Sequence, residues 1–295
     1  MTYRVVHRTE YRYSSEVSSS YGELYLLPRD GPEQVCHSSH VQIEPAPHDY
    51  RERIDFYGNR TAYFAVLDPH TKLTVTAEST VDVNRPSSLP LPVDQPWETI
   101  RDRLRTDPGD DAFDAREFLL DSPKVVVSPA VAAYAAESFT AGRSLTDALT
   151  ELSSRIHTDF AYKPGSTSVR TTLTELLELR KGVCQDFAHL TVGCLRSVGL
   201  AGRYVSGYLE TVPPPGKARL VGADVSHAWA SVFVSDVGWV DVDPTNDRFV
   251  SDRYVTTACG RDYGDVSPLK GVIYTRSKMN KLHVSVDVTH IDGTV

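Results

Sequence analysis

The sequence predicts an α+β protein: an N-terminal antiparallel β-sandwich followed by a second half in which helices pack on an antiparallel sheet. Three observations support this class. In residues 1–85, the side chains alternate with the two-residue period of β-strands, and no helical period is present. Four prolines then interrupt residues 85–96, and beyond them helical patterns come first and strands return later.

The N-terminal strands follow from the alternation of aromatic and β-branched residues. The first lies over 3–13, where every second residue shares one face, and the pattern repeats over 35–43. Gly58-Asn59 predicts a turn between two further runs, and a last strand fits 73–83. Short strands joined by short turns are typical of a sandwich.

The proline-rich stretch 86–96 predicts a linker, because it can continue neither a sheet nor a helix. It separates an N-terminal domain, 1–85, from a second domain, 97–295. Residues 97–198 have a helical pattern, with one helix over 147–156 and another that Thr171 or Thr172 caps. Expected strands of this half lie at 202–209, 226–234, 239–242, 272–274 and 282–291.

Composition excludes several classes of function. The 295 residues carry a net charge of -8, which argues against nucleic acid and anionic membranes as partners. No stretch is apolar enough for a membrane span, and the first ten residues do not resemble a signal peptide. Four cysteines without a C-x-x-C pair suit a reducing compartment, so a cytoplasmic location is expected. The acidic stretch 107–114 lacks the ligand spacing of an EF-hand and predicts a solvated loop.

Cys184 precedes a run of apolar residues that share one face of a helix. The unpaired amides at a helix start favour a thiolate, and Lys181 would add to this effect. Gly182 allows close backbone approach, whereas Asp186 opposes a second negative charge. Taken alone, Cys184 fits a buried packing residue better.

A histidine and an aspartate follow in the order that thiol catalysis needs. His227 begins an apolar strand, and Asp243 ends the next strand before a proline. A base would accept the thiol proton, and a carboxylate would orient the imidazole. Asp241 competes with Asp243, because both point to the same face of the strand. A core histidine and a turn-forming aspartate are the structural alternatives.

These segments resemble the transglutaminase-like superfamily of papain-type cysteine enzymes, in particular bacterial members with an extra N-terminal β domain. The resemblance rests on five segments of the sequence in the family's order: 172–190 with Gly182-Val183-Cys184-Gln185-Asp186, 201–209, His227-Ala228-Trp229, Asp243-Pro244-Thr245-Asn246 and 260–268. It implies that Cys184 is the nucleophile, His227 the base and Asp243 the orienting acid. The backbone amide of Cys184 is then the expected first oxyanion donor, and the second is unassigned.

Other residues have weaker claims to the site. Trp229, which shares the side of its strand with His227, would line a substrate groove or pack in the core, and Tyr208 and Arg261 are further groove candidates. His189 and Cys194 are expected to be structural. Cys259 lies in a predicted loop before Gly260, from which it could approach the site.

The expected function is cysteine-dependent acyl transfer at an amide bond through a thioester, without a cofactor. The resemblance implies a peptidase or amidase acting on a peptide or protein substrate. A protein-glutamine transglutaminase with an amine acceptor is the first alternative, and a non-catalytic peptide-binding scaffold is the second. A zinc site built from Cys184, His227 and Asp243 is possible in ligand type, but it lacks the closely paired ligands of structural zinc sites. The substrate and the oligomeric state do not follow from the sequence.

Overall fold

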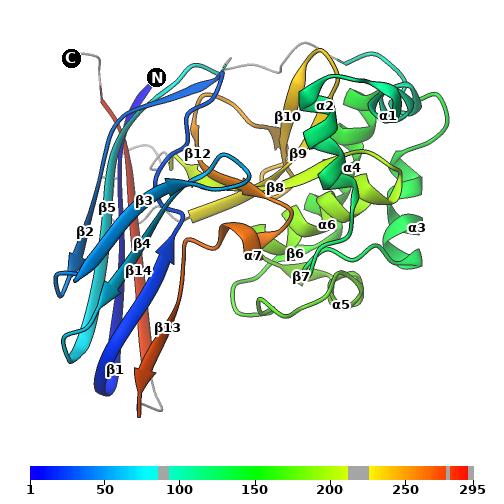
Figure 1. Ribbon diagram of the computed structural model, residues 1–295. Helices are drawn as coiled ribbons and strands as arrows, with labels where there is room; N and C mark the ends of the chain where they lie inside the picture. The colour runs from blue at the N-terminus through cyan, green and yellow to red at the C-terminus, as the bar shows by residue number, and fades with distance from the viewer. Residues whose placement is uncertain (86–92, 212–225, 277–279, 292–295) are drawn as a thin grey trace, which may run out of the picture.

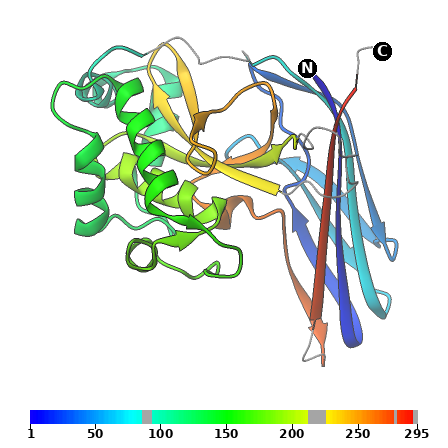
Figure 2. The ribbon, with the colours of Figure 1, turned by 180° about the vertical axis from the view of Figure 1, so that it is seen from behind.

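The computed structural model describes residues 1–85, 93–211, 226–276 and 280–291. A seven-stranded sheet and a five-stranded sheet lie side by side, and the helices cover the side of the smaller sheet that faces away from the larger one (Figures 1 and 2). The predicted α+β class is confirmed.

The large sheet contains β1 (Thr2–Leu24), β2 (Gln34–Glu44), β3 (Asp49–Ile54), β4 (Arg60–Val66), β5 (His70–Val83), β13 (Leu269–Thr275) and β14 (Asn280–His290). The smaller sheet has the order β11 (Arg248–Phe249), β10 (Gly238–Asp243), β9 (Ser226–Val234), β8 (Gly202–Leu209) and β12 (Tyr254–Gly260). Two short strands, β6 (Ala161–Tyr162) and β7 (Lys181–Gly182), pair in parallel. The helices are α1 (Trp97–Thr106), α2 (Asp110–Ala115), the 3-10 helix η1 (Arg116–Leu119), α3 (Pro129–Ser138), α4 (Leu145–Asp159), α5 (Leu173–Leu179), α6 (Cys184–Ser197) and α7 (Tyr263–Val266).

The N-terminal strands form one continuous hydrogen-bonded sheet, and β1 runs through both of its halves. The register of β1 against β5 is interrupted between Arg12 and Val17, and the two halves share a core. Ile43 and Val75 from one half pack in the same cluster as Phe64 and Val66 from the other. The predicted sandwich is therefore built by a single antiparallel sheet that folds over itself.

The last two strands of the chain complete this N-terminal sheet, which corrects their placement in the catalytic half. β14 pairs with Tyr3–Tyr13 of β1, and β13 pairs with the second half of β1. Both strands alternate in a way that fits either sheet, so the sequence pattern did not reveal their partner. Of the predicted linker 86–96, residues 86–92 lie outside the described residues.

The smaller sheet packs against α6, and their shared core is the largest cluster of buried apolar residues in the described chain. Leu190 and Leu195 of α6 meet Ala230 and Val232 of β9 there. The predicted cap of α5 is Thr172, whose hydroxyl and Glu175 form a reciprocal capping box. No helix among the described residues has the length and apolar character needed to cross a membrane.

Specific hydrogen bonds join the two sheets. Gln34 of β2 donates to the Thr256 carbonyl and accepts from its amide, and Asn59 does the same with Cys259. Both amide side chains are buried, so the contacts satisfy backbone groups of β12 that would otherwise lack partners. The N-terminal sheet is thus fixed against one edge of the smaller sheet.

Candidate active site

Cys184 is the first residue of α6, half-buried and not in a disulfide. The turn before it is held by the carboxylate of Asp186, which accepts hydrogen bonds from the Val183 amide at 2.8 Å and from the Thr167 hydroxyl at 2.6 Å. A Cβ atom at Gly182 would lie 2.8 Å from the same carboxylate. Only glycine therefore fits beside this carboxylate, and the local contacts set the position of the thiol.

Asp186 stabilises the helix start in a buried position. Burial raises the pKa of Asp186, although the hydrogen bonds from Thr167 and Val183 act in the opposite direction. Its carboxylate oxygen Oδ2 is occupied by these two donors. Asp186, whose negative charge disfavours a thiolate at Cys184, therefore has a structural role in the turn before α6.

His227 begins β9, and its Nε2 lies 2.7 Å from the Oδ2 atom of Asp243 at the end of β10. Asp243 has no exposed surface and accepts four further hydrogen bonds, which come from the Tyr254 hydroxyl, the Asn246 side chain and the amides of Thr245 and Asn246. Burial opposes its ionisation, but the hydrogen bond and charge of His227 lower the pKa of Asp243. The carboxylate is therefore held ionised and in a fixed orientation beside the imidazole.

Cys184 lies close enough to His227 for its thiol to contribute to the pKa of the imidazole. Burial alone would lower the pKa of His227, but hydrogen bonds and charge from Asp243 and Cys184 outweigh burial and raise that pKa well above its ordinary value. Because Nε2 faces Asp243, Nδ1 is the ring nitrogen left for the thiol. The imidazole of His227 is thus bonded to Asp243 and has Cys184 as a neighbour that favours its protonated form.

His227 is expected to remain protonated at pH 7.5, where an ordinary histidine is mostly neutral. The pKa in the folded chain exceeds that in the unfolded chain, so the stabilisation from this charge is complete below about pH 6.5. This stabilisation is lost as the pH rises through the pKa that His227 has in the folded chain. A proton NMR titration of the histidine rings checks this, with Cys184→Ala expected to move the titration of His227 to lower pH. A His227 resonance that titrates near pH 6.5 in the unmodified chain would contradict the expectation.

Asp241 does not reach the imidazole. Its Oδ2 atom forms an ion pair with Arg85 at 3.0 Å on the side of the smaller sheet that faces the N-terminal strands. Asp243 is directed differently because the turn at 244–246 supplies amide donors to its carboxylate. The choice of Asp243 over Asp241 therefore agrees with the geometry.

The three groove candidates do not line an open groove. Trp229 is fully buried and packs edge-on against Tyr254, with ring centroids 5.4 Å apart. Tyr208 is also buried, and its hydroxyl contacts His7 at 2.9 Å in the core between the two sheets. Arg261 pairs with Asp265 at 2.9 Å. No local pattern in the sequence indicates that the N-terminal strands cover Tyr208.

The other residues considered for the site are buried in the interior of the fold. His189 is buried, accepts a hydrogen bond from the Tyr263 amide at 3.0 Å, and has its pKa lowered to about 4 by burial. Burial raises the pKa of Cys194, which has no exposed surface, to about 12. Cys259 lies in strand β12 and not in the predicted loop, because its backbone pairs with β8 and with Asn59.

Three residues near the site were not singled out from the sequence. Asn246 and Tyr254 donate to the Asp243 carboxylate at 2.7 and 2.8 Å. Tyr162 is 55% exposed, and its pKa is raised by burial and by the nearby Cys184. The pairing of β6 with β7 brings Tyr162 beside Cys184, so it is a better candidate for contact with substrate than the three buried or paired residues.

The arrangement brings a thiol, an imidazole and a buried carboxylate into one region. The amide of Cys184 lies in the first turn of α6, where N–H groups have no partner within the helix. Such an amide can donate to an oxyanion that forms at a carbonyl attacked by the thiol. Among the described residues, no group of three or more His, Cys, Asp or Glu side chains is arranged to hold a metal ion.

Comparison with protein families gives two matches along the chain. Residues 3–82 match the bacterial transglutaminase-like N-terminal region, and residues 132–244 match the transglutaminase-like superfamily. The second match contains Cys184, His227 and Asp243.

Individual proteins resemble the chain over different lengths. An uncharacterized Mycobacterium tuberculosis protein is 48% identical over 99% of this chain and 93% of its own length, and one from Mycobacterium leprae is 36% identical over 98% of both. A protein-glutamine gamma-glutamyltransferase of Pseudomonas aeruginosa is 35% identical over 92 residues, which are 30% of this chain and 14% of that protein. A Cytophaga hutchinsonii crystal structure, described as that of a candidate cysteine protease, superposes with a TM-score of 0.74 at 20% identity and covers 100% of this chain and 92% of its own.

Proposed function

The chain belongs to the transglutaminase-like superfamily of papain-like fold, and from this premise we propose that it is a cysteine-dependent acyl-transfer enzyme. The proposed reaction is the hydrolysis of an amide bond in a peptide or protein. The observation that carries the proposal is the position of His227, which is hydrogen-bonded to Asp243 and neighbours the thiol of Cys184.

The first half of the proposed reaction forms a thioester. The Cys184 thiolate attacks the carbonyl carbon, and the carbonyl oxygen takes the negative charge within reach of the Cys184 amide. As the C–N bond breaks, the leaving nitrogen takes a proton from the imidazolium of His227. Ammonia or an amine departs, and the acyl group remains on sulfur.

The second half releases the acyl group. The neutral imidazole of His227 removes a proton from water, which attacks the thioester carbon. The C–S bond breaks, the acid leaves, and the thiolate and imidazolium are restored. Asp243 keeps Nδ1 of the ring directed to the reacting atoms and compensates the charge on the ring in both halves.

Exposure near the thiol favours water over an amine as the acceptor. Cys184 is half-buried and the adjacent Tyr162 is 55% exposed, so solvent reaches this side of the site. A transferase must protect its thioester from water until an amine arrives. Amine transfer is the second candidate function, favoured by the similarity to the Pseudomonas aeruginosa glutamyltransferase.

The product identifies the reaction. A library of glutamine-containing peptides incubated with a labelled amine is expected to give free acids or cleaved peptides in excess over labelled adducts, and Cys184→Ala is expected to give neither. Adducts without free acid would show that the chain is a transglutaminase. Equal product from the Cys184→Ala chain would contradict the acyl-transfer proposal as a whole.

A further inference from the structure

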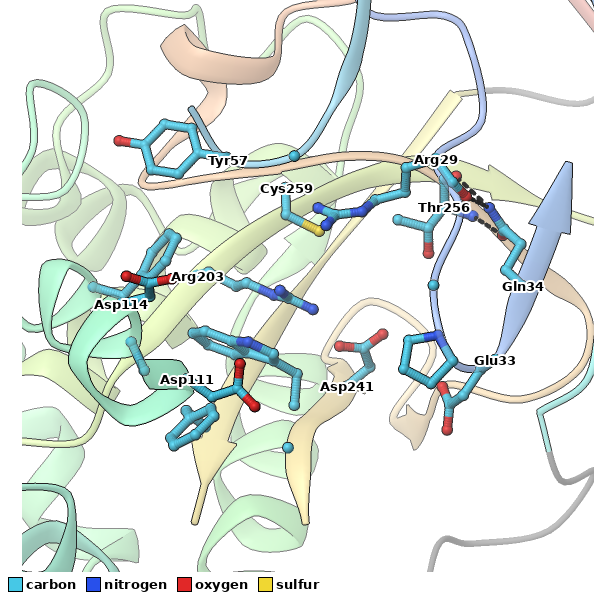
Figure 3. A pocket seen from close by; sticks show the side chains of 18 of the residues that line it. Arg29, Glu33, Gln34, Tyr57, Asp111, Asp114, Arg203, Asp241, Thr256 and Cys259 are labelled. Carbon is cyan, nitrogen blue, oxygen red and sulfur yellow. Dashed lines mark hydrogen bonds between the residues drawn. The ribbon is translucent and has the colours of Figure 1, made fainter. Parts of the chain in front are cut away.

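A cavity of about 640 Å³ lies between the N-terminal sheet and the smaller sheet, away from Cys184 (Figure 3). Its walls come from both units: Arg29 and Tyr57 from the N-terminal strands and loops, and Arg203, Trp239 and Asp241 from β8 and β10. None of Cys184, His227 and Asp243 lines it. A volume of this size accommodates a small molecule.

Two residues that line the cavity, Arg203 and Asp241, belong to a polar row that crosses three strands. Arg203 of β8 lies opposite Ser231 of β9, which lies opposite Asp241 of β10. Arg203 Nε, Ser231 Oγ and Asp241 Oδ1 are all buried without a hydrogen-bond partner in the described part of the protein, as is Arg85 Nη1 beside them. Buried polar atoms without partners are costly, so three of them on residues that line one cavity indicate a site that takes polar groups from a ligand.

The arginines at this site differ in their partners. Arg85, whose side chain is only 10% exposed, pairs with Glu33 and Asp241 at 2.8 and 3.0 Å. Within the described ranges, Arg203 forms no ion pair, and its guanidinium carbon lies 4.0 Å from the centroid of the Trp239 ring. In the part of the chain that the structure describes, Arg29 donates only to the amide oxygen of Asn59, at 3.2 Å. Two guanidinium groups therefore face the cavity without a carboxylate.

An unpaired arginine in this position favours an anion. Burial lowers the pKa of Arg203, and the charge of the nearby Asp241 offsets the cost of removing the guanidinium from water only in part. The planar guanidinium fork matches a carboxylate in shape and charge. Arg29 and Arg203 point toward the same region of the cavity (Figure 3).

Negatively charged side chains line another part of the same cavity. Asp111 and Asp114 of α2 are exposed, and neither forms an ion pair among the described residues. They lie on the side of Arg203 away from Glu33 (Figure 3). A ligand with a second negative charge would meet these carboxylates, whereas an ammonium group would be attracted to them.

We propose that this cavity binds a small zwitterion with the size and charges of an amino acid or dipeptide. Its carboxylate contacts Arg203 and Arg29, and its ammonium group faces Asp111 and Asp114. The residues involved are separate from the thiol site, so this proposal does not depend on the enzymatic one.

The test measures binding of L-alanyl-L-alanine to the full chain carrying Cys184→Ala, which removes the proposed nucleophile. Thermal unfolding and the fluorescence of Trp239, which contacts Arg203, report occupancy. We expect the dipeptide to raise the unfolding temperature in a saturable way. Arg203→Gln is expected to weaken binding by about tenfold or more, because it removes a charge-assisted hydrogen-bond donor.

Each control separates one part of the proposal. Arg51→Gln, an exposed arginine on β3, is expected to bind as the parent chain does. L-Alanyl-L-alaninamide, which lacks the carboxylate, and N-acetyl-L-alanyl-L-alanine, which lacks the ammonium group, are both expected to bind at least tenfold more weakly. Equal binding of either analogue, inorganic phosphate binding more tightly than the dipeptide, or no response to the dipeptide would each overturn the zwitterion site. Arg29→Gln repeats the test if Arg203→Gln does not fold, and unchanged affinity there would also overturn it.

Discussion

Iodoacetamide is expected to alkylate Cys184 rapidly at pH 6, and His227→Ala is expected to slow this reaction by about a hundredfold. An ordinary cysteine thiol, with a pKa near 8.5, is less than about 1% ionised at that pH. In the proposed mechanism the imidazolium of His227, which Asp243 and Cys184 both favour, supports the sulfur of Cys184 as a nucleophile at this pH. The lower intrinsic reactivity of a thiolate stabilised in this way reduces the gain, so a hundredfold is the expected scale.

Mass spectrometry of the alkylated peptides measures each cysteine separately, and the chain supplies its own controls. Cys36 is also half-buried, but burial raises its pKa and it has no histidine partner among the described residues. It should react slowly at pH 6 in every variant. His40→Ala, which replaces an exposed histidine of β2, should leave the rate at Cys184 unchanged. A slow, alkaline reaction of Cys184 that is the same in His227→Ala would contradict both the ion pair and the proposed enzyme.

Local sequence patterns predicted the elements that position the site. The strands at 202–209 and 226–234 have the predicted limits, and α6 begins at Cys184 as expected from the apolar stripe that follows it. These features depend on the period of side chains along one element, which is visible in a single sequence. The order of the thiol, imidazole and carboxylate along the chain could be read in the same way.

Contacts between distant segments were not predictable in this way. The strands near 272–274 and 282–291 were expected beside the catalytic helices, but they pair with β1 because register and partner depend on the whole sheet. Tyr208 was expected to line a substrate groove, but the N-terminal strands pack against it and bury it. Tyr254 donates to Asp243 from a strand at the other edge of the sheet, and no local pattern marks that pairing.

The alternation of side chains along β10 does not distinguish Asp241, in the polar row, from Asp243. Alternation places Asp241 and Asp243 on one face of β10, and the sequence alone offers both to the histidine. The structure separates them because Asp241 pairs with Arg85 from the end of the N-terminal unit, while Asp243 is bound by the turn that follows it. The partner of each carboxylate thus depends on which neighbouring segment lies above it.

Asp243→Asn is expected to reduce turnover by about a hundredfold to ten-thousandfold on the peptide that the product assay identifies. The carboxylate accepts from His227, Tyr254 and Asn246, and an amide in its place would direct N–H groups at some of these donors. The ring would lose both its orientation and the charge that raises its pKa. The alkaline limb of the turnover profile should therefore move to lower pH, together with the NMR titration of His227.

Two further variants distinguish a positioning role of Asp243 from a general loss of structure. Asp247→Asn makes the same change four residues later, at an exposed position whose φ of 49° asparagine tolerates, and should leave both turnover and its pH profile unchanged. Tyr254→Phe removes one donor to Asp243 and keeps the ring that packs on Trp229, so turnover should fall by only a few-fold. If Asp243→Asn lowered the unfolding temperature but left the pH profile and the rate of alkylation at Cys184 unchanged, Asp243 would serve stability alone. If all three properties changed together in the folded variant, its effect would pass through the imidazole, because His227 is the group that connects Asp243 to the thiol.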